Sequence, residues 1–554
     1  MRVSVYNRLM AMQANRRDVL KGAATVGAAS ACVATGVPII STRPAWADES
    51  LRMALMKIPG AGHGSPTDAD MQKVGELCLG PTKQTVKPGE FKGVDFAFMG
   101  LNNQNVHNFL FRAFLKPWEA YTGASIKWID LAQADYNARL QQSIASGTVD
   151  YHIIEMGAPF EGDVCGRGLT SVMPDWVKQQ IDMDDYVAYL KPPVGTWDGK
   201  LYRVCIDSDC HTLNFRTDVF SDPELTKQWK AAGGIGDWGP PKTWQQVQAV
   251  TKFLKGKKVR GKDVWGYLDP TKPWGGFAFY FLESRATAYA KHPGDKNWLF
   301  DPDMKPRVNN PAFVRAIQDV LDALPSEPAD QLNADPNTTG FQQFLAGTGS
   351  LLAWWGDIGT VAKTSDTAVI GDVLDFDILP GSDDVYNPNT KQWEKLASGP
   401  NQAPNMAYLG WGIYVMASVD SDSKRQKAVW SAAAHLGGKD ISLWMAAYPS
   451  GFQPYRLSHT NMDEWVAAGY DRKYITSYMK SQSTSYNHPN SAIEPRIPGI
   501  FQYYSIAEDE LARIYAGKET AQQGADNIAA AWEKLTDKLG REQQIKYYKI
   551  AMGL

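Results

Sequence analysis

The chain has few cysteines, and none of them is spaced as in a metal or haem site. Five cysteines occur in 554 residues, without a C-x-x-C or C-x-x-C-H pattern, the spacings of iron–sulfur and c-type haem attachment sites. The eight histidines are scattered, and none forms a metal-binding pattern such as H-E-x-x-H. We therefore expect neither a metal nor a cofactor.

Motifs of common enzyme classes are also missing. No G-x-S-x-G nucleophile elbow is present. Residues Gly234–Gly239 match G-x-G-x-x-G, but no strand precedes them and Pro240-Pro241 follows instead of a helix, so they are interpreted as a loop. A carboxylate pair for glycoside hydrolysis stays open, because only its separation in space defines it.

An excess of positive charge is absent too. The chain carries 57 basic and 60 acidic residues, and six of the basic ones but only one acid lie within residues 1–47. The remaining chain is therefore clearly acidic. This balance argues against nucleic acid and against anionic membrane surfaces as partners.

The first 47 residues have the features of an export signal. Arg16-Arg17 forms a twin-arginine pattern, an apolar run covers Gly22–Ile40, and Ala45-Trp46-Ala47 provides an A-x-A cleavage site. A membrane anchor is the alternative, but the run is rich in Ala and Gly and contains Pro38. We expect residues 1–47 to be a twin-arginine signal peptide, removed on export to the periplasm.

Alternation of predicted strands and helices indicates the fold class. Strands are expected at 94–99, 125–130 and 150–155, with a helix at 109–121 and another whose buried face carries residues four apart (Tyr136, Leu140 and Ile144). This rhythm favours an α/β sheet with right-handed crossovers. The length of the chain favours two domains. Residues 48–90 show little periodicity and are interpreted as an irregular N-terminal extension lying on the first domain.

The stretch 196–220 is interpreted as a backbone crossing between two bodies. A turn at Asp198-Gly199 leads through an apolar segment to Asp207 and Asp209, and a second apolar run follows. The two carboxylates point to the same face of an extended segment. They could hold ligand hydroxyls, perform acid/base chemistry, or merely be solvated. Cys205 and Cys210 are candidates for a disulfide at this crossing, and two free thiols are the alternative.

Aromatic residues beside amides and carboxylates gather at several loop edges. Flat rings cover the C–H faces of sugars, while Asn, Gln, Asp and Glu bind the hydroxyls. The pattern therefore favours a carbohydrate or polyol cleft. The aromatic residues concerned are Trp274, Trp354, Trp355, Trp411, Tyr503 and Tyr504.

An ordered set of short motifs resembles the family 1 extracellular solute-binding proteins of ABC importers, the maltose-binding-protein-like group. The resemblance covers residues 92–540 approximately. The motifs that carry it are Trp118–Gly123, Leu140–Asp150, Asp198–Tyr202, Thr212–Phe220, Pro241–Trp244, Phe344–Gly347, Leu379–Gly381 and Leu409–Gly412.

This resemblance implies an α/β, two-lobed periplasmic-binding-protein fold with hinge strands and a ligand cleft between the lobes. Lobe I would hold residues 91–207 and 378–455, and lobe II residues 208–377 and 456–554. The ligand-contacting residues that it suggests, together with those from the patterns above, are Asn102, Asn103, Gln104, Glu155, Asp207, Asp209, Trp274, Trp354, Trp355, Asp357, Gly410, Trp411 and Tyr503.

The sequence thus predicts a non-enzymatic, monomeric binding protein that captures a sugar, sugar alcohol or glycerol and delivers it to the permease subunits of an ABC importer. The alternative is an exported carbohydrate-active enzyme, using Asp207, Asp209 and Glu155, or a cofactor-bearing twin-arginine substrate. A scaffold or adhesion protein is a third, weaker interpretation.

Overall fold

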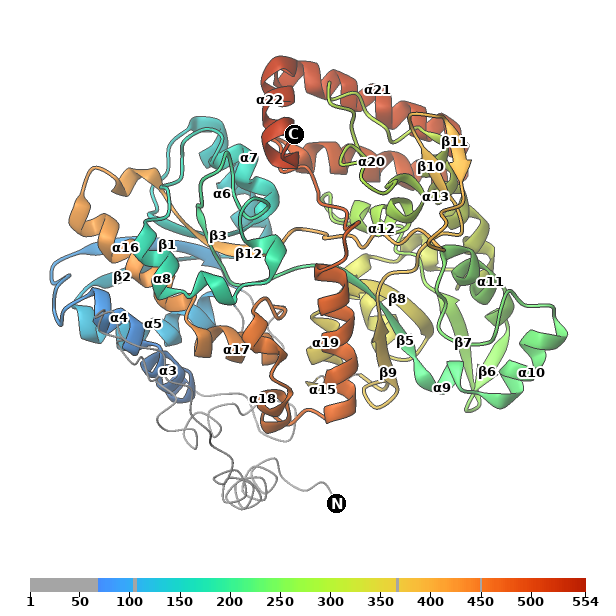
Figure 1. The fold of residues 1–554 in the computed structure, drawn as a ribbon, viewed down its shortest axis with the longest axis horizontal. Coiled ribbons are helices and arrows are strands. Elements are labelled where there is room, and N and C mark those ends of the chain that lie inside the picture. The colour runs from blue at the N-terminus through green and yellow to red at the C-terminus, as the bar shows by residue number, and fades with distance from the viewer. Residues whose placement is uncertain (1–67, 103–106, 365–367, 449–450) are drawn as a thin grey trace, which may run out of the picture.

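Two five-stranded sheets, each covered by helices, form two lobes that lie side by side (Figure 1). The computed structural model describes residues 68–102, 107–364, 368–448 and 451–554. The signal-peptide prediction for residues 1–47 lies outside these ranges. The expected α/β fold with two lobes is confirmed.

The sheet of the first lobe has the strand order β2-β1-β3-β12-β4. Strand β1 runs parallel to β2 and β3, whereas β12 is antiparallel to both β3 and β4. The late strand β12 therefore lies between two early strands. The strands are β1 (Asp95–Leu101), β2 (Ser125–Leu131), β3 (Ile153–Gly157), β4 (Arg203–Cys205) and β12 (Trp411–Val415).

Helices from both ends of the sequence surround this sheet. The amphipathic helix α5 packs against α16, which comes from the region after β12. The helices of this lobe are α5 (Asn108–Thr122), α6 (Gln133–Ser146), α7 (Glu161–Val164), α8 (Asp175–Gln180), α16 (Ser423–Leu436) and α17 (Lys439–Ala447).

The end of the N-terminal extension is helical, which corrects the expectation that it is irregular. Helices α3 (Asp68–Leu77) and α4 (Leu79–Thr85) pack on lobe I against α5, α16 and α17. Met71 and Val74 are buried one helical turn apart. Gly75 permits the close approach to α5, because a Cβ there would lie 2.3 Å from the Phe114 carbonyl oxygen. The frequent Gly and Pro residues upstream masked this short amphipathic pattern.

The sheet of the second lobe has the order β6-β7-β8-β5-β9. Strand β8 is parallel to β7 and antiparallel to β5, which is also antiparallel to β9. All residues of the central strands β5 and β8 are buried. The strands are β5 (His211–Arg216), β6 (Lys257–Val259), β7 (Lys262–Tyr267), β8 (Gly349–Trp355) and β9 (Leu374–Asp377).

Capping residues mark the beginnings of two long helices of this lobe. Asn310 caps α13, accepting hydrogen bonds from two backbone N–H groups, and Pro311 occupies the first helical turn. Thr520 and Gln523 form a capping box at α21. The helices are α9 (Thr217–Phe220), α10 (Pro223–Ala231), α11 (Trp244–Leu254), α12 (Phe279–Ala290), α13 (Pro311–Ala323), α14 (Gln342–Leu345), α15 (Ile358–Thr364), α18 (Met462–Ala467), α19 (Arg472–Tyr486), α20 (Ile500–Tyr515), α21 (Ala521–Leu539) and α22 (Arg541–Met552).

One expected boundary between the lobes differs from the structure. The expected boundary at residue 378 assigns the hairpin of β10 (Val385–Asn387) and β11 (Gln392–Glu394) to lobe I. Instead β10 contacts α12 and α13 of the second lobe. Backbone hydrogen bonds between Gly381 and the segment 242–244, which leads into α11, fasten it there.

The described chain passes between the two sheets in three connecting segments. The first joins β4 to β5, the second leads from β9 to β12, and the third, within 448–471, leads from α17 towards α19. The first segment carries Asp207 and Asp209, as the crossing interpreted from 196–220 requires.

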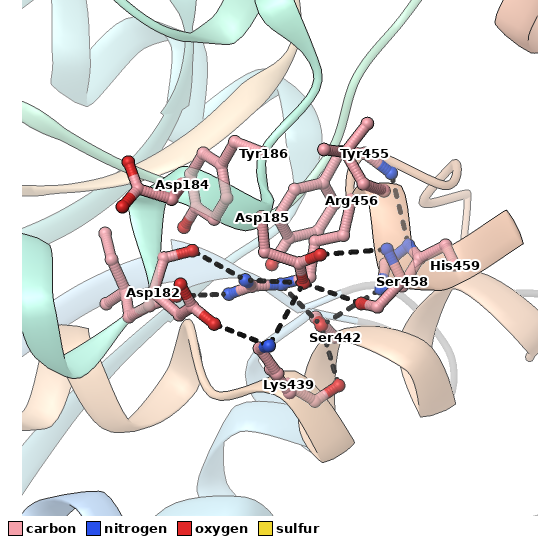
Figure 2. Close-up of polar contacts among 12 residues, drawn as sticks. Asp182, Asp184, Asp185, Tyr186, Lys439, Ser442, Tyr455, Arg456, Ser458 and His459 are labelled. Carbon is pink, nitrogen blue, oxygen red and sulfur yellow. Dashed lines mark hydrogen bonds and ion pairs between the residues drawn. The ribbon is translucent and has the colours of Figure 1, made fainter. Parts of the chain in front are cut away.

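Arg456 fastens the third connecting segment to lobe I (Figure 2). Its guanidinium, which is fully buried, donates to the backbone oxygens of Ile181 at 2.9 Å and of Gly437, and to Ser442 Oγ at 3.0 Å. It also lies 3.4 Å from an oxygen of Asp185. Only an arginine has enough donors, in a fixed planar geometry, to satisfy these acceptors together.

We expect Arg456→Lys to lower the free energy of unfolding by about 3 kcal/mol, because a lysine leaves several buried acceptors and Asp185 without their donors. Urea denaturation followed by tryptophan fluorescence measures this. The matched control is Arg513→Lys on the surface, where water competes for the exposed ion pair with Glu519 and the substitution should change stability little. Equal midpoints for the two variants would show that Arg456 does not anchor the segment.

Candidate functional site

A cavity of about 560 Å³ lies where the connecting segments meet the ends of β1, β8 and β12. Parallel strands present their carboxyl ends at one edge of a sheet, the usual position of ligand sites in α/β folds. The residues that line the cavity are Leu101, His107, Asn137, Asp207, Asp209, Trp274, Gly275, Phe277, Trp354, Trp355, Asp357, Tyr408, Trp411, Gly451 and Phe452.

Aromatic rings and carboxyl groups dominate this lining. Seven of the lining side chains are Trp, Tyr or Phe and three are Asp, and among the lining residues that the structure describes none is Lys or Arg. The Tyr408 and Trp411 rings stack with centroids 5.3 Å apart and planes 19° apart. The cavity therefore offers flat apolar walls and hydrogen-bond acceptors.

Gln453 fixes the two aspartates of the first connecting segment. Its backbone N–H donates to Asp207 Oδ1 at 2.6 Å, and its side-chain amide donates to Asp209 Oδ1 at 2.7 Å. Its Oε1 accepts from the backbone N–H of Gly356, directly after β8, at 2.8 Å. Asp207 Oδ1 also accepts from the Ser208 backbone at 2.7 Å. One buried side chain thus joins two connecting segments and lobe II.

The environment of these carboxyls disfavours their charged forms. Burial, with smaller contributions from neighbouring carboxyls, raises the pKa of Asp207 and of Asp209 well above their ordinary values. Burial also raises the pKa of Asp357 to about 7. Near neutral pH the cavity therefore holds several exchangeable protons.

Glu155 supports the wall of the cavity from behind. It is fully buried in β3, where Oε1 accepts from the Leu101 backbone N–H at 2.6 Å. Its other oxygen accepts from Trp411 Nε1 at 2.9 Å and lies 2.5 Å from His107 Nδ1. Glu155 does not itself line the cavity. It orients two rings that do.

Strained backbone brings the Tyr408 ring to the cavity. Tyr408, Leu409 and Gly410 all have positive φ angles, of 73°, 42° and 88°. Such conformations persist only where surrounding contacts enforce them, and Arg203 Nη1 donates to the Leu409 oxygen at 2.9 Å. Gly410 allows close approach, because a Cβ there would lie 2.5 Å from the Asp207 carbonyl oxygen.

Comparison with known protein families now decides the identity. A family model described as a bacterial extracellular solute-binding protein matches residues 113–470, well over half of the chain. The chain belongs to this family of bacterial extracellular solute-binding proteins. A search among curated proteins found no match.

Solved structures share the fold of this solute-binding protein at low sequence identity. A solute-binding protein of an ABC transporter from Agrobacterium radiobacter K84, in complex with ribitol, has 18% identity and a TM-score of 0.58, covering 81% of this chain and all of its own. One from Agrobacterium vitis S4 with D-mannitol has 17% identity and a TM-score of 0.57, covering 81% and 99%. Maltose-bound T. maritima MalE3 has 15% identity and a TM-score of 0.58, covering 80% and 100%.

The structure of the binding protein brings seven of the suggested ligand residues together. They are Asp207, Asp209, Trp274, Trp354, Trp355, Asp357 and Trp411. Gly410 lies beside the cavity rather than in its lining. Six lining side chains were not foreseen, and they are Leu101, His107, Asn137, Phe277, Tyr408 and Phe452.

Other suggested residues lie elsewhere. Asn102 faces a separate surface pocket formed with Arg112 and Asp130. Tyr503 is a correction: it is buried between helices, its hydroxyl is 2.9 Å from Thr536 Oγ1, and its ring packs against Trp532. The helical turn of α20 directs it towards α21 and away from the cavity. Asn103 and Gln104 lie outside the described residues.

The candidate disulfide at the crossing is not formed. Cys205 and Cys210 are both free and buried. Cys205 Sγ donates to the Asp207 carbonyl oxygen at 2.8 Å, and Cys210 Sγ donates to Gln482 Oε1 at 3.4 Å. Each thiol is thus held by a different partner.

Within residues 68–102, 107–364, 368–448 and 451–554, no three His, Cys, Asp or Glu side chains converge as metal ligands. No helix in these ranges is long and apolar enough to cross a bilayer.

A second buried acid, Glu494, lies behind the cavity in lobe II. Its Oε2 accepts from the Tyr280 hydroxyl at 2.6 Å, whereas Oε1 has no hydrogen-bond partner among the described residues. Burial raises the pKa of Glu494 to about 8. The folded protein therefore keeps a proton there that the unfolded chain loses above its ordinary pKa of about 4.3.

We expect the free energy of unfolding to fall as pH rises from 5 to 8, with Glu494 contributing about 1.4 kcal/mol per pH unit. The raised pKa means that this stabilisation is complete at acidic pH and is lost as pH approaches the folded-state value. Glu494→Gln cannot ionise, so its stability should fall less steeply over the same range. Urea denaturation at several pH values measures both slopes.

The control for this experiment is Glu542→Gln, which replaces an exposed glutamate near the start of α22. It should keep the slope of the parent protein. If the curves of Glu494→Gln and the parent run parallel, Glu494 does not carry the retained proton.

Proposed function

We propose that this protein captures a carbohydrate or polyol in the periplasm and delivers it to the permease of an ABC importer. The observation that carries the proposal is the cavity between the lobes, with seven aromatic rings beside three carboxyl groups. Aromatic rings pack on the apolar faces of a sugar, and carboxyl oxygens accept hydrogen bonds from its hydroxyl groups. Structurally similar proteins hold ribitol, D-mannitol and maltose, which supports this ligand class.

Export by the twin-arginine route and a monomeric state belong to the same proposal. The twin arginines at 16–17 and the A-x-A site at 45–47 support export and cleavage. The family itself is extracellular. A periplasmic receptor of this kind needs a membrane partner, and the ABC permease fits that role.

Binding in this proposal requires no chemistry on the ligand. The ligand enters between the lobes, and the three connecting segments bend as the lobes close over it. The closed state places both walls of the cavity against the ligand and therefore binds it more tightly than the open state. This difference in affinity favours closure. The protein then presents an unchanged solute to the permease.

Thermal-shift screening of the mature protein tests the proposal. Sugars, sugar alcohols, glycerol and amino acids are added, and each stabilising compound is then recovered for mass analysis. A bound carbohydrate at 100 times its Kd should stabilise the protein by about 2.7 kcal/mol and be recovered intact. Recovery of a cleaved or oxidised product would instead establish an enzyme.

We expect Trp274→Ala to weaken binding of the carbohydrate at least about tenfold, equivalent to about 1.4 kcal/mol, because it removes one aromatic wall. Trp274 lies on the loop between β7 and α12, half-buried, with its ring 6.4 Å from that of Trp355. Isothermal titration calorimetry gives both affinities. Trp393→Ala, another half-buried tryptophan on the remote β11 strand, is the control and should bind normally. Normal binding by Trp274→Ala would remove this ring from the site.

A further inference from the structure

Asp207 and Asp209 each present to the cavity a carboxyl oxygen that has no hydrogen-bond partner among the described residues. Asp207 and Asp209 are only 4% and 7% exposed. Each uses Oδ1 for the bonds from Gln453, and neither Oδ2 makes a hydrogen bond with any described residue. Asp357 adds a buried Oδ1 that also has no partner in the described structure. The side chains of all three aspartates belong to the lining of one cavity of about 560 Å³.

The protein provides little positive charge to balance these oxygens. No lysine or arginine among the described residues forms an ion pair with Asp207, Asp209 or Asp357 within 4.0 Å. Arg203 influences them from a distance, but it donates to the backbone of 409–410 and pairs with Glu161 at 3.6 Å. His107 contacts Glu155 instead.

Two of the indole donors in the same lining already bond to protein groups. Of the four lining tryptophans, Trp355 donates its Nε1–H to the Ala407 oxygen and Trp411 donates to Glu155. Because their N–H groups are used, Trp355 and Trp411 contact a ligand through their π faces. A neutral polyol presents one acceptor oxygen with every hydroxyl donor, whereas a protonated amine presents donors alone. The carboxyl oxygens of the cavity, once ionised, match the amine.

The aromatic walls favour a cation as well. The face of an aromatic ring attracts a positive charge within about 6 Å of its centroid, most strongly for Trp and when solvent is excluded. Tyr408 stacks on Trp411, and Phe277 lies 5.2 Å from Tyr408 between centroids. Carboxylates surrounded by rings recognise an ammonium group by both charge and shape.

We propose that the solute carries a positively charged amine, bound by Asp207 and Asp209, and that it is an amino sugar or amino polyol. The hydroxylated part of this ligand rests on the proposed function; the charge rests on the unpaired carboxyls and the ring faces. The amine supplies the counter-charge that the lobes lack.

Binding of such a solute is linked to pH. The titratable and charged groups that face Asp207 and Asp209 are each other, Asp357, Glu494, Tyr189, Tyr408, Cys205, Cys210 and the more distant Arg203. The carboxyls must ionise to bind a cation, so an amine displaces their protons into solvent. Affinity for the amine therefore falls as pH is lowered below the raised pKa values, while affinity for a neutral polyol has no such requirement.

The test compares matched pairs by calorimetry at pH 7.5 and 5.5. The pairs are glucose and glucosamine, sorbitol and N-methyl-D-glucamine, and glycerol and 3-amino-1,2-propanediol. Putrescine is added as an amine without hydroxyls. At least one aminated compound should bind tenfold or more tightly than its neutral partner at pH 7.5, with a smaller ratio at pH 5.5.

Each result has a distinct meaning. Neutral members that bind as tightly as the amines, or more tightly, overturn the charge inference and leave the proposed function intact. Binding of putrescine without any sugar or polyol overturns the proposed function and supports the charge inference. If none of the amines binds, the inference is wrong.

One substitution tests the charge of the Asp209 carboxyl separately from its hydrogen bond to Gln453. Asp209→Asn keeps an oxygen to accept from Gln453 but cannot ionise, so it should lose tenfold or more affinity for the amine and less than threefold for its neutral partner. Asp163→Asn, at another buried carboxyl that accepts from the Gly499 backbone outside the cavity, is the control. Asp357→Asn serves if Asp209→Asn fails to fold. Equal losses for both partners of a pair would overturn the inference.

Discussion

The hydrogen bonds of Gln453 are the constraint on which the cleft depends. This side chain lies on the third connecting segment, yet it holds both aspartates of the first and the backbone directly after β8. All its polar groups are used within a buried environment, where an unsatisfied group costs about 1–3 kcal/mol. The carboxyls therefore cannot turn away from the cavity without breaking this junction. Arg456, three residues later, fixes the same segment to lobe I.

This junction explains how acidic groups persist in a closed interior. Burial of an ionised carboxylate is costly, and proteins reduce the cost by pairing the charge or by keeping the proton. In this cavity the described residues provide amide donors rather than cations, so the protons are retained. Asp207 and Asp209 therefore keep their protons more readily than exposed carboxyls, and they become anionic when a ligand provides compensation. The carboxyl groups of Asp207 and Asp209 thus hold the connecting segments together and also respond to the charge of the ligand.

The sequence predicted features that depend on neighbouring residues and missed those that depend on distant ones. Strand and helix periodicity located β1, β2 and α5, and the crossing with Asp207 and Asp209 was visible as one continuous stretch. Gln453 carried only a faint signal, a lone amide between Phe452 and Pro454, because its aspartate partners are 246 and 244 residues away in the chain. Tyr503 was misplaced because a helix directs neighbouring side chains to different faces, and no local pattern tells which face meets the cleft.

The paired environment of the aspartates favours binding over hydrolysis. A glycoside hydrolase needs one carboxyl protonated as the acid and another ionised as the base or nucleophile, so its site must separate their pKa values. Here burial raises the pKa of both Asp207 and Asp209, and Gln453 donates a hydrogen bond to each of them. Groups treated alike by their surroundings suit a shared task, such as gripping one polar group of a solute.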